Sequence, residues 1–140
     1  MAKKIVVGLD GSKCSEKALE YAVQLAEKLC STLVLTNIVP QAPYTQGDFY
    51  YGEKIQAAAQ KDCEQVLVQQ QEQLKARGIT SELVCMTGSP ADKIVELSEK
   101  VEADAIVVGS RGLSSIKSLL LGSVSNAVAQ KAKRTVIIVK

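Results

Sequence analysis

The stretch AIVVGSRG at residues 105–112 decides the fold of this chain. Its first four residues are apolar and mostly β-branched, which is typical of a strand covered on both faces, and hence of a parallel sheet. Gly109 and Gly112 follow, where the chain has to turn away from the sheet. A parallel sheet with helices on both faces is therefore the framework into which the other segments must fit.

Four further segments are predicted to be strands of this sheet. Residues 4–8, 32–39 and 135–139 are short apolar runs, and residues 80–86 carry more polar side chains, as expected nearer an edge. Between the strands, apolar residues recur at the spacing of helices that bury one face. These residues are Ala18, Leu19, Ala22, Val23, Ala26 and Leu29; Ile55, Ala59, Cys63, Val66, Leu67 and Leu74; Ala91, Ile94, Val95 and Val101; and Val124, Ala127 and Val128.

Local signals mark the ends of the predicted helices. Ser12 or Ser15 can cap the first helix, and Gly78 can end the second. Ser89-Pro90 is a typical start for the third, and the fourth is predicted to begin near Gly122. The regular alternation of strand and helix predicts right-handed crossovers and a three-layer α/β sandwich.

Length and composition predict one domain over residues 1–140, because 46% of the residues are hydrophobic and 23% are charged. A chain of this length buries roughly 65–70% of its unfolded surface, so a stable core does not require disulfides. Cys14, Cys30, Cys63 and Cys85 form no C-x-x-C pair, and we expect them to be reduced core residues. No apolar run approaches the ~20 residues of a membrane-spanning helix and no signal peptide is evident, so we expect a cytoplasmic protein that does not bind membranes.

The absence of histidine and tryptophan narrows the possible functions. Without histidine, the chain has no His general base, no Ser-His-Asp or Cys-His arrangement and no imidazole metal site. A net charge of +2, with four Tyr and one Phe, gives little support for nucleic-acid binding. The P-loop and the dinucleotide-binding G-x-G-x-x-G pattern after a strand are also absent.

Glycines and serines after the fourth strand in chain order form the strongest candidate site. Open parallel sheets bind ligands beyond the carboxyl ends of their strands, where the strand order reverses. Gly109 and Gly112 permit close approach to the backbone, and the first-turn amides and hydroxyls near Gly122, Ser123 and Ser125 favour phosphate. The alternative is that the glycines are ordinary turn residues and that Ser123 only caps a helix.

Other residues near the predicted strand ends have two interpretations each. Asp10 can contact a ribose hydroxyl or a phosphate-bound Mg²⁺, or it can form an Asx turn. Arg111 can neutralise phosphate, or it can be a solvated loop residue. Aromatic residues around the loop at residues 40–52 can cover a base or pack against a partner subunit. They are Tyr44, Phe49, Tyr50 and Tyr51.

The spacing Gly109-x2-Gly112-x9-Gly122-Ser123 resembles the G-2x-G-9x-G-[ST] motif of the universal stress protein family, in its ATP-binding branch. The resemblance extends over the chain, from IVVGLDGS at residues 5–12 to TVIIV at residues 135–139. It implies an adenine nucleotide alpha hydrolase-like fold, with a five-stranded parallel sheet in the order 3-2-1-4-5 and four helices.

The resemblance also implies bound ATP with Mg²⁺, between the ends of the first and fourth strands. Asp10 would meet the ribose or a metal-linked phosphate, and Ile38 would present backbone groups to adenine. The implied site consists of Gly8, Asp10, Ile38, Gly109, Gly112, Gly122, Ser123, Val124 and Ser125. Arg111 joins it as a residue that can neutralise phosphate, although some ATP-binding relatives carry His or another residue at this position. A homodimer through the last strand is implied as well, and it would cover an apolar edge that otherwise promotes aggregation. The residues of that edge are Val136, Ile137, Ile138 and Val139.

Three functions remain as alternatives. The first is a homodimeric regulatory module of the stress response that binds ATP and responds to it. The second is a slow ATPase, or a protein that phosphorylates itself on a residue such as Ser125, for which Asp10 and Arg111 are present but no evident base. The third is a dimeric scaffold that no longer uses nucleotide. The intact glycine motif favours the first over the third.

Overall fold

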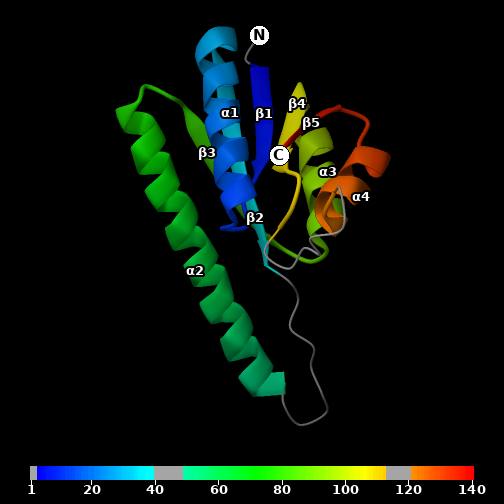
Figure 1. Ribbon diagram of the computed structural model, residues 1–140. Helices are drawn as coiled ribbons and strands as arrows, with labels where there is room; N and C mark the ends of the chain where they lie inside the picture. Colours follow the sequence, from blue (N-terminus) through cyan, green and yellow to red (C-terminus); the bar gives the residue numbers. More distant parts are fainter. Residues whose placement is uncertain (1–2, 40–48, 113–120) are drawn as a thin grey trace.

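The computed structural model describes residues 3–39, 49–112 and 121–140 (Figure 1). Its strands are β1 (Lys3–Gly8), β2 (Ser31–Val39), β3 (Ser81–Thr87), β4 (Ala105–Gly109) and β5 (Thr135–Val139). Its helices are α1 (Lys13–Leu29), α2 (Phe49–Ala76), α3 (Pro90–Lys100) and α4 (Ser123–Lys131). The strands form one parallel sheet in the order β3-β2-β1-β4-β5, which confirms the predicted sheet and its order.

Helices cover both faces of the sheet. α1 and α2 pack on one face, and α3 and α4 pack on the other (Figure 1). Because side chains alternate along a strand, Ile5 and Val7 of β1 lie in the core under α1, while Val6 lies in the core under α3 and α4. The fold is therefore the three-layer α/β sandwich that the sequence predicts.

Local signals place the helix ends as expected. Ser12 rather than Ser15 caps α1, because its Oγ accepts a hydrogen bond from the Ser15 amide at 3.2 Å. Gly78, with a φ of +78°, follows the end of α2 in the left-handed conformation that glycine adopts easily. Ser89 and Pro90 begin α3.

The predicted apolar stripe of α2 is only partly buried. Cys63, Leu67 and Leu74 face the sheet and are at most 4% exposed. Ile55 and Val66 are 49% and 47% exposed, and for these two the prediction is wrong. Both lie roughly a quarter turn from the line of the three buried side chains, so the sequence pattern suggested too wide a stripe. Although α2 is 28 residues long, neither it nor any other helix in the described ranges is apolar enough to cross a membrane.

The cysteines depart from the prediction of four reduced thiols. Cys63 of α2 and Cys85 of β3 form a disulfide with their Cα atoms 6.4 Å apart, whereas Cys14 and Cys30 are free. The prediction was wrong for the pair because a separation of 22 residues matches no motif. Only the packing of α2 on the sheet brings the two residues together. The prediction was also wrong in placing Cys30 in the core, because Cys30 is exposed.

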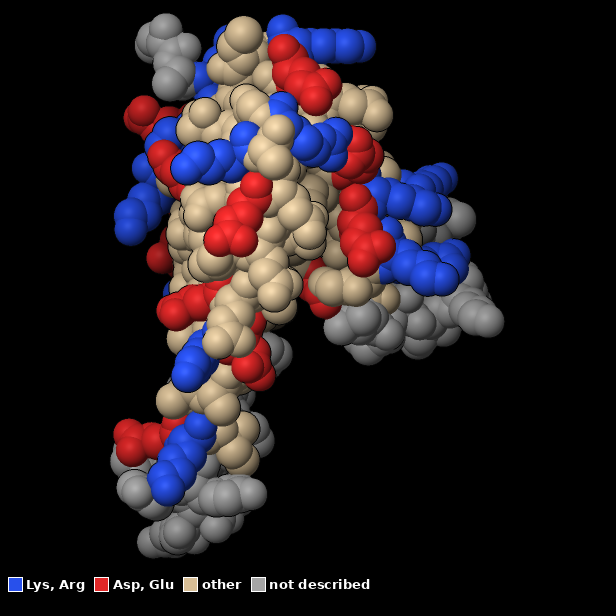
Figure 2. Space-filling model, turned by 90° about the vertical axis from the view of Figure 1, so that its left-hand side faces the viewer, with Lys and Arg blue, Asp and Glu red and all other residues tan. Residues whose placement is uncertain are grey.

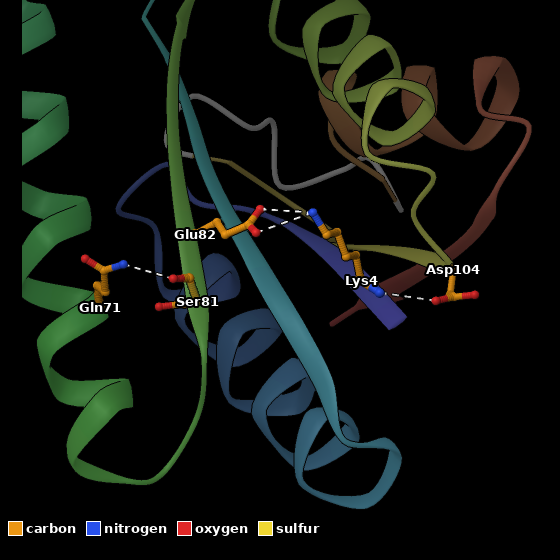
Figure 3. A network of polar contacts seen from close by, with 5 residues as sticks. All are labelled: Lys4, Gln71, Ser81, Glu82 and Asp104. Carbon is orange, nitrogen blue, oxygen red and sulfur yellow. Dashed lines mark hydrogen bonds and ion pairs between the residues drawn. The ribbon is translucent and has the colours of Figure 1, made fainter. Parts of the chain in front are cut away.

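Polar contacts join the amino ends of the strands (Figure 3). Lys4 of β1 reaches across β2 to Glu82 of β3, with Nζ 3.4 Å from both carboxylate oxygens, and its amide donates to Asp104 Oδ2 at 3.2 Å. Gln71 Nε2 of α2 donates to the Ser81 carbonyl of β3 at 2.9 Å. These contacts join strands and a helix at the amino ends of the strands. None of them involves the carboxyl ends, where a ligand is expected.

Candidate functional site

The candidate site lies at the carboxyl ends of the central strands β1 and β4. The strand order reverses between them, because β2 and β3 lie on one side of β1 while β4 and β5 lie on the other. Parallel α/β sheets bind ligands at this point. Asp10 follows β1, Arg111 and Gly112 follow β4, and α4 begins at Ser123. Short contacts join these three segments.

Asp10 forms the turn between β1 and α1. Its Oδ1 accepts a hydrogen bond from the Ser12 amide at 2.9 Å, and Gly11 has a φ of +84°. This Asx turn is one of the two interpretations that the sequence leaves open. Because the turn uses only one carboxylate oxygen and the residue is exposed, Oδ2 remains for a second contact. The Asx turn and a ligand contact are therefore compatible.

Gly112 lies against the Asp10 carboxylate. A β-carbon at position 112 would lie 2.7 Å from Asp10 Oδ2, too close for the carboxylate to keep its position. The Ser12 hydroxyl also reaches this segment, because its Oγ donates to the Arg111 carbonyl at 3.4 Å. The turn after β1 and the segment after β4 therefore meet at Gly112, and a side chain there would displace the exposed Asp10 carboxylate.

Gly109 is required by the packing of α1. A β-carbon at this position would lie 2.7 Å from both the carbonyl carbon and the Cβ of Cys14, in the first turn of α1. The sequence suggests a close approach by a ligand at Gly109, whereas the close neighbour in the structure is the protein's own helix. This contact sets the distance between β4 and the turn that carries Asp10.

The start of α4 lies next to the segment after β4. Gly122 is its N-cap residue, and the Gly122 amide donates to the Ser110 carbonyl at 2.6 Å. Within the described residues no side chain makes a capping hydrogen bond to the helix, and Ser123 is exposed while Val124 is half-buried. The amides of the first turn therefore lie at an electropositive helix end that keeps hydrogen-bonding capacity.

Ser125 fastens α4 to the segment after β4. It is 2% exposed, and its Oγ lies 2.9 Å from the Ser110 carbonyl oxygen and 3.1 Å from that of Gly122. The Ser110 carbonyl therefore holds two groups of α4, a role that the sequence reasoning missed. No sequence signal marks it, since any residue type supplies a backbone carbonyl.

Comparison with known proteins gives the family. The model of the universal stress protein family matches residues 1–140. The chain belongs to this family. It is 31% identical to universal stress protein YxiE of Bacillus subtilis over 148 residues, which cover 100% of both proteins. The structure of universal stress protein UspA from Lactobacillus plantarum superposes with a TM-score of 0.90 at 21% identity, over 99% of this chain and 97% of that one. A universal stress protein solved in complex with cAMP is 32% identical, with a TM-score of 0.66 over 99% and 97% of the two chains.

In this universal stress protein, the backbone of Ile38 extends past the end of β1. The ladder between β1 and β2 ends at the Gly8–Thr36 pair, and the Leu9 amide donates to the Thr36 carbonyl at 2.8 Å. Backbone groups two residues apart on a strand point to the same side, so those of Ile38 point beyond the last residue of β1. The Ile38 side chain is buried in the core, and only its backbone is placed to contact a ligand.

Two contacts hold the elements that flank the site. At Gly8, the last residue of β1, a β-carbon would lie 3.2 Å from Ile94 of α3 and Val108 of β4, so the strand end packs closely on that side. Lys131 Nζ of α4 lies 2.8 Å from Asp92 Oδ1 of α3, and this hydrogen bond lowers the pKa of the Asp92 carboxyl. The close packing at Gly8 limits the distance of α3 from the strand end, and the exposed Lys131–Asp92 ion pair joins α3 to α4.

Arg111 is half-buried, and its guanidinium has no hydrogen-bond or ion-pair partner within residues 3–39, 49–112 and 121–140. Its positive charge is therefore not neutralised by a described carboxylate. The structure describes no side chain of the aromatic group that the sequence singles out. Tyr44 is not among the described residues, nor are the side chains of Phe49, Tyr50 and Tyr51.

Proposed function

We propose that this universal stress protein binds ATP with Mg²⁺ at the carboxyl ends of β1 and β4. The observation that carries the proposal is the uncapped first turn of α4, joined through Ser110 to the segment that contacts Asp10. Amides at a helix N-terminus bind phosphate through hydrogen bonds and the helix dipole. The backbone amides of Ser123 and Val124 and the Ser123 hydroxyl would donate hydrogen bonds to the phosphates. Gly122, which has no side chain, would leave space for the phosphates to reach them.

Ile38 is suited to contact the adenine base. Its backbone offers one amide donor and one carbonyl acceptor beyond the end of β1. Adenine presents an acceptor nitrogen next to an amino donor, which is the complementary arrangement. Because the contact would use only the main chain, it is compatible with the burial of the Ile38 side chain. Gly8 would line the site next to it.

Asp10 would bind the Mg²⁺ ion that accompanies the phosphates, and Arg111 would offset part of their negative charge. In nucleotide sites Mg²⁺ binds one or two carboxylates together with phosphate oxygens and water, and Asp10 Oδ2 fits this set of ligands. No group of three or more acidic or thiol side chains that could hold a metal alone occurs in the described part of the chain. The metal would therefore arrive with the nucleotide, and Arg111 would add a positive charge.

The geometry favours a binding module over an enzyme. The Ser125 hydroxyl is buried and engaged with backbone carbonyls, so it is poorly placed to accept a phosphoryl group. The chain also contains no histidine to act as a base. We therefore propose a cytoplasmic regulatory module of the stress response, in which bound ATP stabilises one folded conformation.

The nucleotide that copurifies with the protein tests this proposal. The full chain is purified, denatured by heat, and the supernatant is separated by ion-exchange chromatography. We expect to recover ATP, because the amides in the first turn of α4 are proposed to bind its phosphate chain. Recovery of ADP would instead favour slow hydrolysis. Recovery of cAMP would favour the ligand with which a relative has been solved. Absence of nucleotide would favour the scaffold function.

A thermal shift serves as the control for that experiment. Added at a hundredfold excess over its dissociation constant, Mg-ATP should stabilise the nucleotide-free protein by about 2.7 kcal/mol. AMP at the same concentration should give a smaller shift, since it lacks the β- and γ-phosphates. Equal shifts with both would argue against phosphate recognition at α4.

The outer edge of β5 is the proposed dimer contact. The Ser110 amide donates to the Val139 carbonyl at 2.8 Å, so the backbone groups of Val139 and Ile137 face β4. Those of Val136 and Ile138 face the open edge. Residues 136–139 are all partly exposed, and pairing with β5 of a second chain would cover them.

Ile138→Pro should convert the proposed dimer to a monomer. Proline would remove a donor on the open edge while keeping every bond of β5 to β4, and edge positions tolerate proline for this reason. Multi-angle light scattering measures the mass. Ile137→Pro is the matched control, because it removes a donor that faces β4 and should lower the melting temperature instead. A dimeric Ile138→Pro protein would show that the contact lies elsewhere.

A further inference from the structure

The Cys63–Cys85 disulfide lies where α2 leaves the sheet. In residues 53–62 no side chain is buried, and Cys63, at 4% exposed, is the first buried residue after them. The amino-terminal part of α2 extends past the carboxyl ends of the strands (Figure 1). Figure 2 shows this part as a column, with acidic and basic side chains along it, that projects beyond the rest of the molecule.

The buried contacts of α2 continue on the carboxyl-terminal side of the disulfide, while Ala59 on its amino-terminal side is only partly buried against the same core. Leu67 and Leu74 are buried against the sheet, and Gln71 donates to the Ser81 carbonyl (Figure 3). Ser81 and Cys85 are four residues apart on β3, so they point to the same face of the sheet. Among the described residues, the disulfide is the covalent link between α2 and the sheet, and it lies at the edge of the projecting part of the helix.

The disulfide also lies beside the strand ends of the candidate site. Cys85 pairs in register with Asn37, and the next residue, Met86, pairs with Ile38. Cys85 therefore lies beside Asn37, the residue before Ile38, whose backbone is proposed to contact adenine. A change in how α2 is held at Cys85 would occur next to this part of the candidate site. The disulfide itself does not depend on nucleotide binding.

The two cysteines differ in exposure. Cys63 is buried, whereas Cys85 is half-buried on the edge strand β3. Thiol–disulfide exchange depends on access to one of the sulfurs, so an external thiolate would reach the pair from the Cys85 side. In the cytoplasm, where this protein is proposed to act, disulfides are rare and those that occur are usually transient and redox-sensing.

We propose that Cys63 and Cys85 form a reversible redox pair, whose disulfide fastens α2 to β3 and whose reduction by a dithiol loosens the projecting part of the helix. A dithiol thiolate attacks Cys85 Sγ, the bond between the two cysteines breaks, and Cys63 leaves as a thiolate. The second thiol of the reductant then forms its own disulfide and releases Cys85. Two electrons and two protons pass to the protein, and the dithiol is oxidised to a disulfide.

Hydrogen peroxide can supply the reverse step. The Cys85 thiolate attacks one peroxide oxygen and becomes a sulfenic acid, and the other oxygen leaves as water once protonated. Cys63 then attacks the Cys85 sulfur and displaces a second water as the disulfide forms. Two thiols and one peroxide thus give one disulfide and two waters.

Counting thiols tests the redox pair. The full chain is equilibrated with mixtures of reduced and oxidised dithiothreitol, quenched with acid, unfolded, and labelled with a maleimide for mass spectrometry. We expect two labels per chain at the oxidising end, on Cys14 and Cys30, and four at the reducing end, with the same transition on reoxidation. Four labels throughout, or two throughout, would overturn the proposal.

Hydrogen exchange tests the structural consequence. After reduction, amides of residues 56–66 should exchange at least about fivefold faster, while those of residues 70–76 should change little, because Leu74 and Gln71 still hold them. The variant with Cys63→Ser and Cys85→Ser should exchange at the faster rate with or without dithiothreitol. Equal exchange of residues 56–66 in the oxidised and reduced wild-type protein would show that the pair does not hold α2. Neither experiment contains nucleotide, so failure of the proposed ATP binding would leave both results interpretable.

Discussion

Gly109→Ala should lower the free energy of unfolding by about 3 kcal/mol or more. The new β-carbon would lie 2.7 Å from two atoms of Cys14 and 2.9 Å from its carbonyl oxygen. The obstructing atoms include backbone in the first turn of α1, which cannot move aside as a flexible side chain can. Urea unfolding followed by circular dichroism measures the change.

Gly8→Ala is the matched control for this result. Its β-carbon would meet only the ends of the Ile94 and Val108 side chains, at 3.2 Å, and these can shift slightly. We expect a loss of about 1 kcal/mol or less. If Gly109→Ala were as stable as Gly8→Ala, the close contact between β4 and α1 would not be the reason for glycine at position 109.

Gly122→Val combined with Ser123→Ala should weaken Mg-ATP binding at least about 100-fold. A β-carbon at position 122 would lie 3.3 Å from the Arg111 Cα and the Ser110 carbonyl oxygen, and valine adds two further methyl groups. The start of α4 would have to move, and the exposed hydroxyl of residue 123 would be lost. Hydrogen bonds to charged groups contribute about 1.5–3 kcal/mol each, and each 1.4 kcal/mol corresponds to tenfold in affinity. Isothermal titration calorimetry gives the dissociation constants.

Two further variants control for indirect effects. Ser123→Ala alone keeps the N-cap glycine and should weaken binding less than the double change, without unsettling the helix start. Ser89→Ala removes the N-cap side chain of α3, which makes no capping hydrogen bond, and should leave the affinity unchanged. Full affinity in a folded double variant would mean that the phosphates bind elsewhere.

Most of the fold was predictable because it depends on local patterns. β-branched runs such as residues 105–109 specify buried strands, and Ser12 and Gly78 act within one turn of the helix ends they mark. The rule for ligand positions in parallel sheets also directed attention to Asp10 and Gly112, which the structure brings together.

The contacts that could not be predicted depend on packing between distant segments. The fit of Gly109 against Cys14 and the disulfide of Cys63 with Cys85 join residues far apart in the chain. The Ser110 carbonyl holds α4 through a group that every residue carries. A single sequence contains no periodic or motif signal for any of these contacts.

A crystal structure of the protein grown with Mg-ATP is the most direct test of the proposed site. We expect phosphate oxygens within hydrogen-bonding distance of the Ser123 and Val124 amides, with adenine against the backbone of Ile38 and the metal near Asp10. An empty start of α4 at saturating nucleotide, or nucleotide bound at another surface, would contradict it.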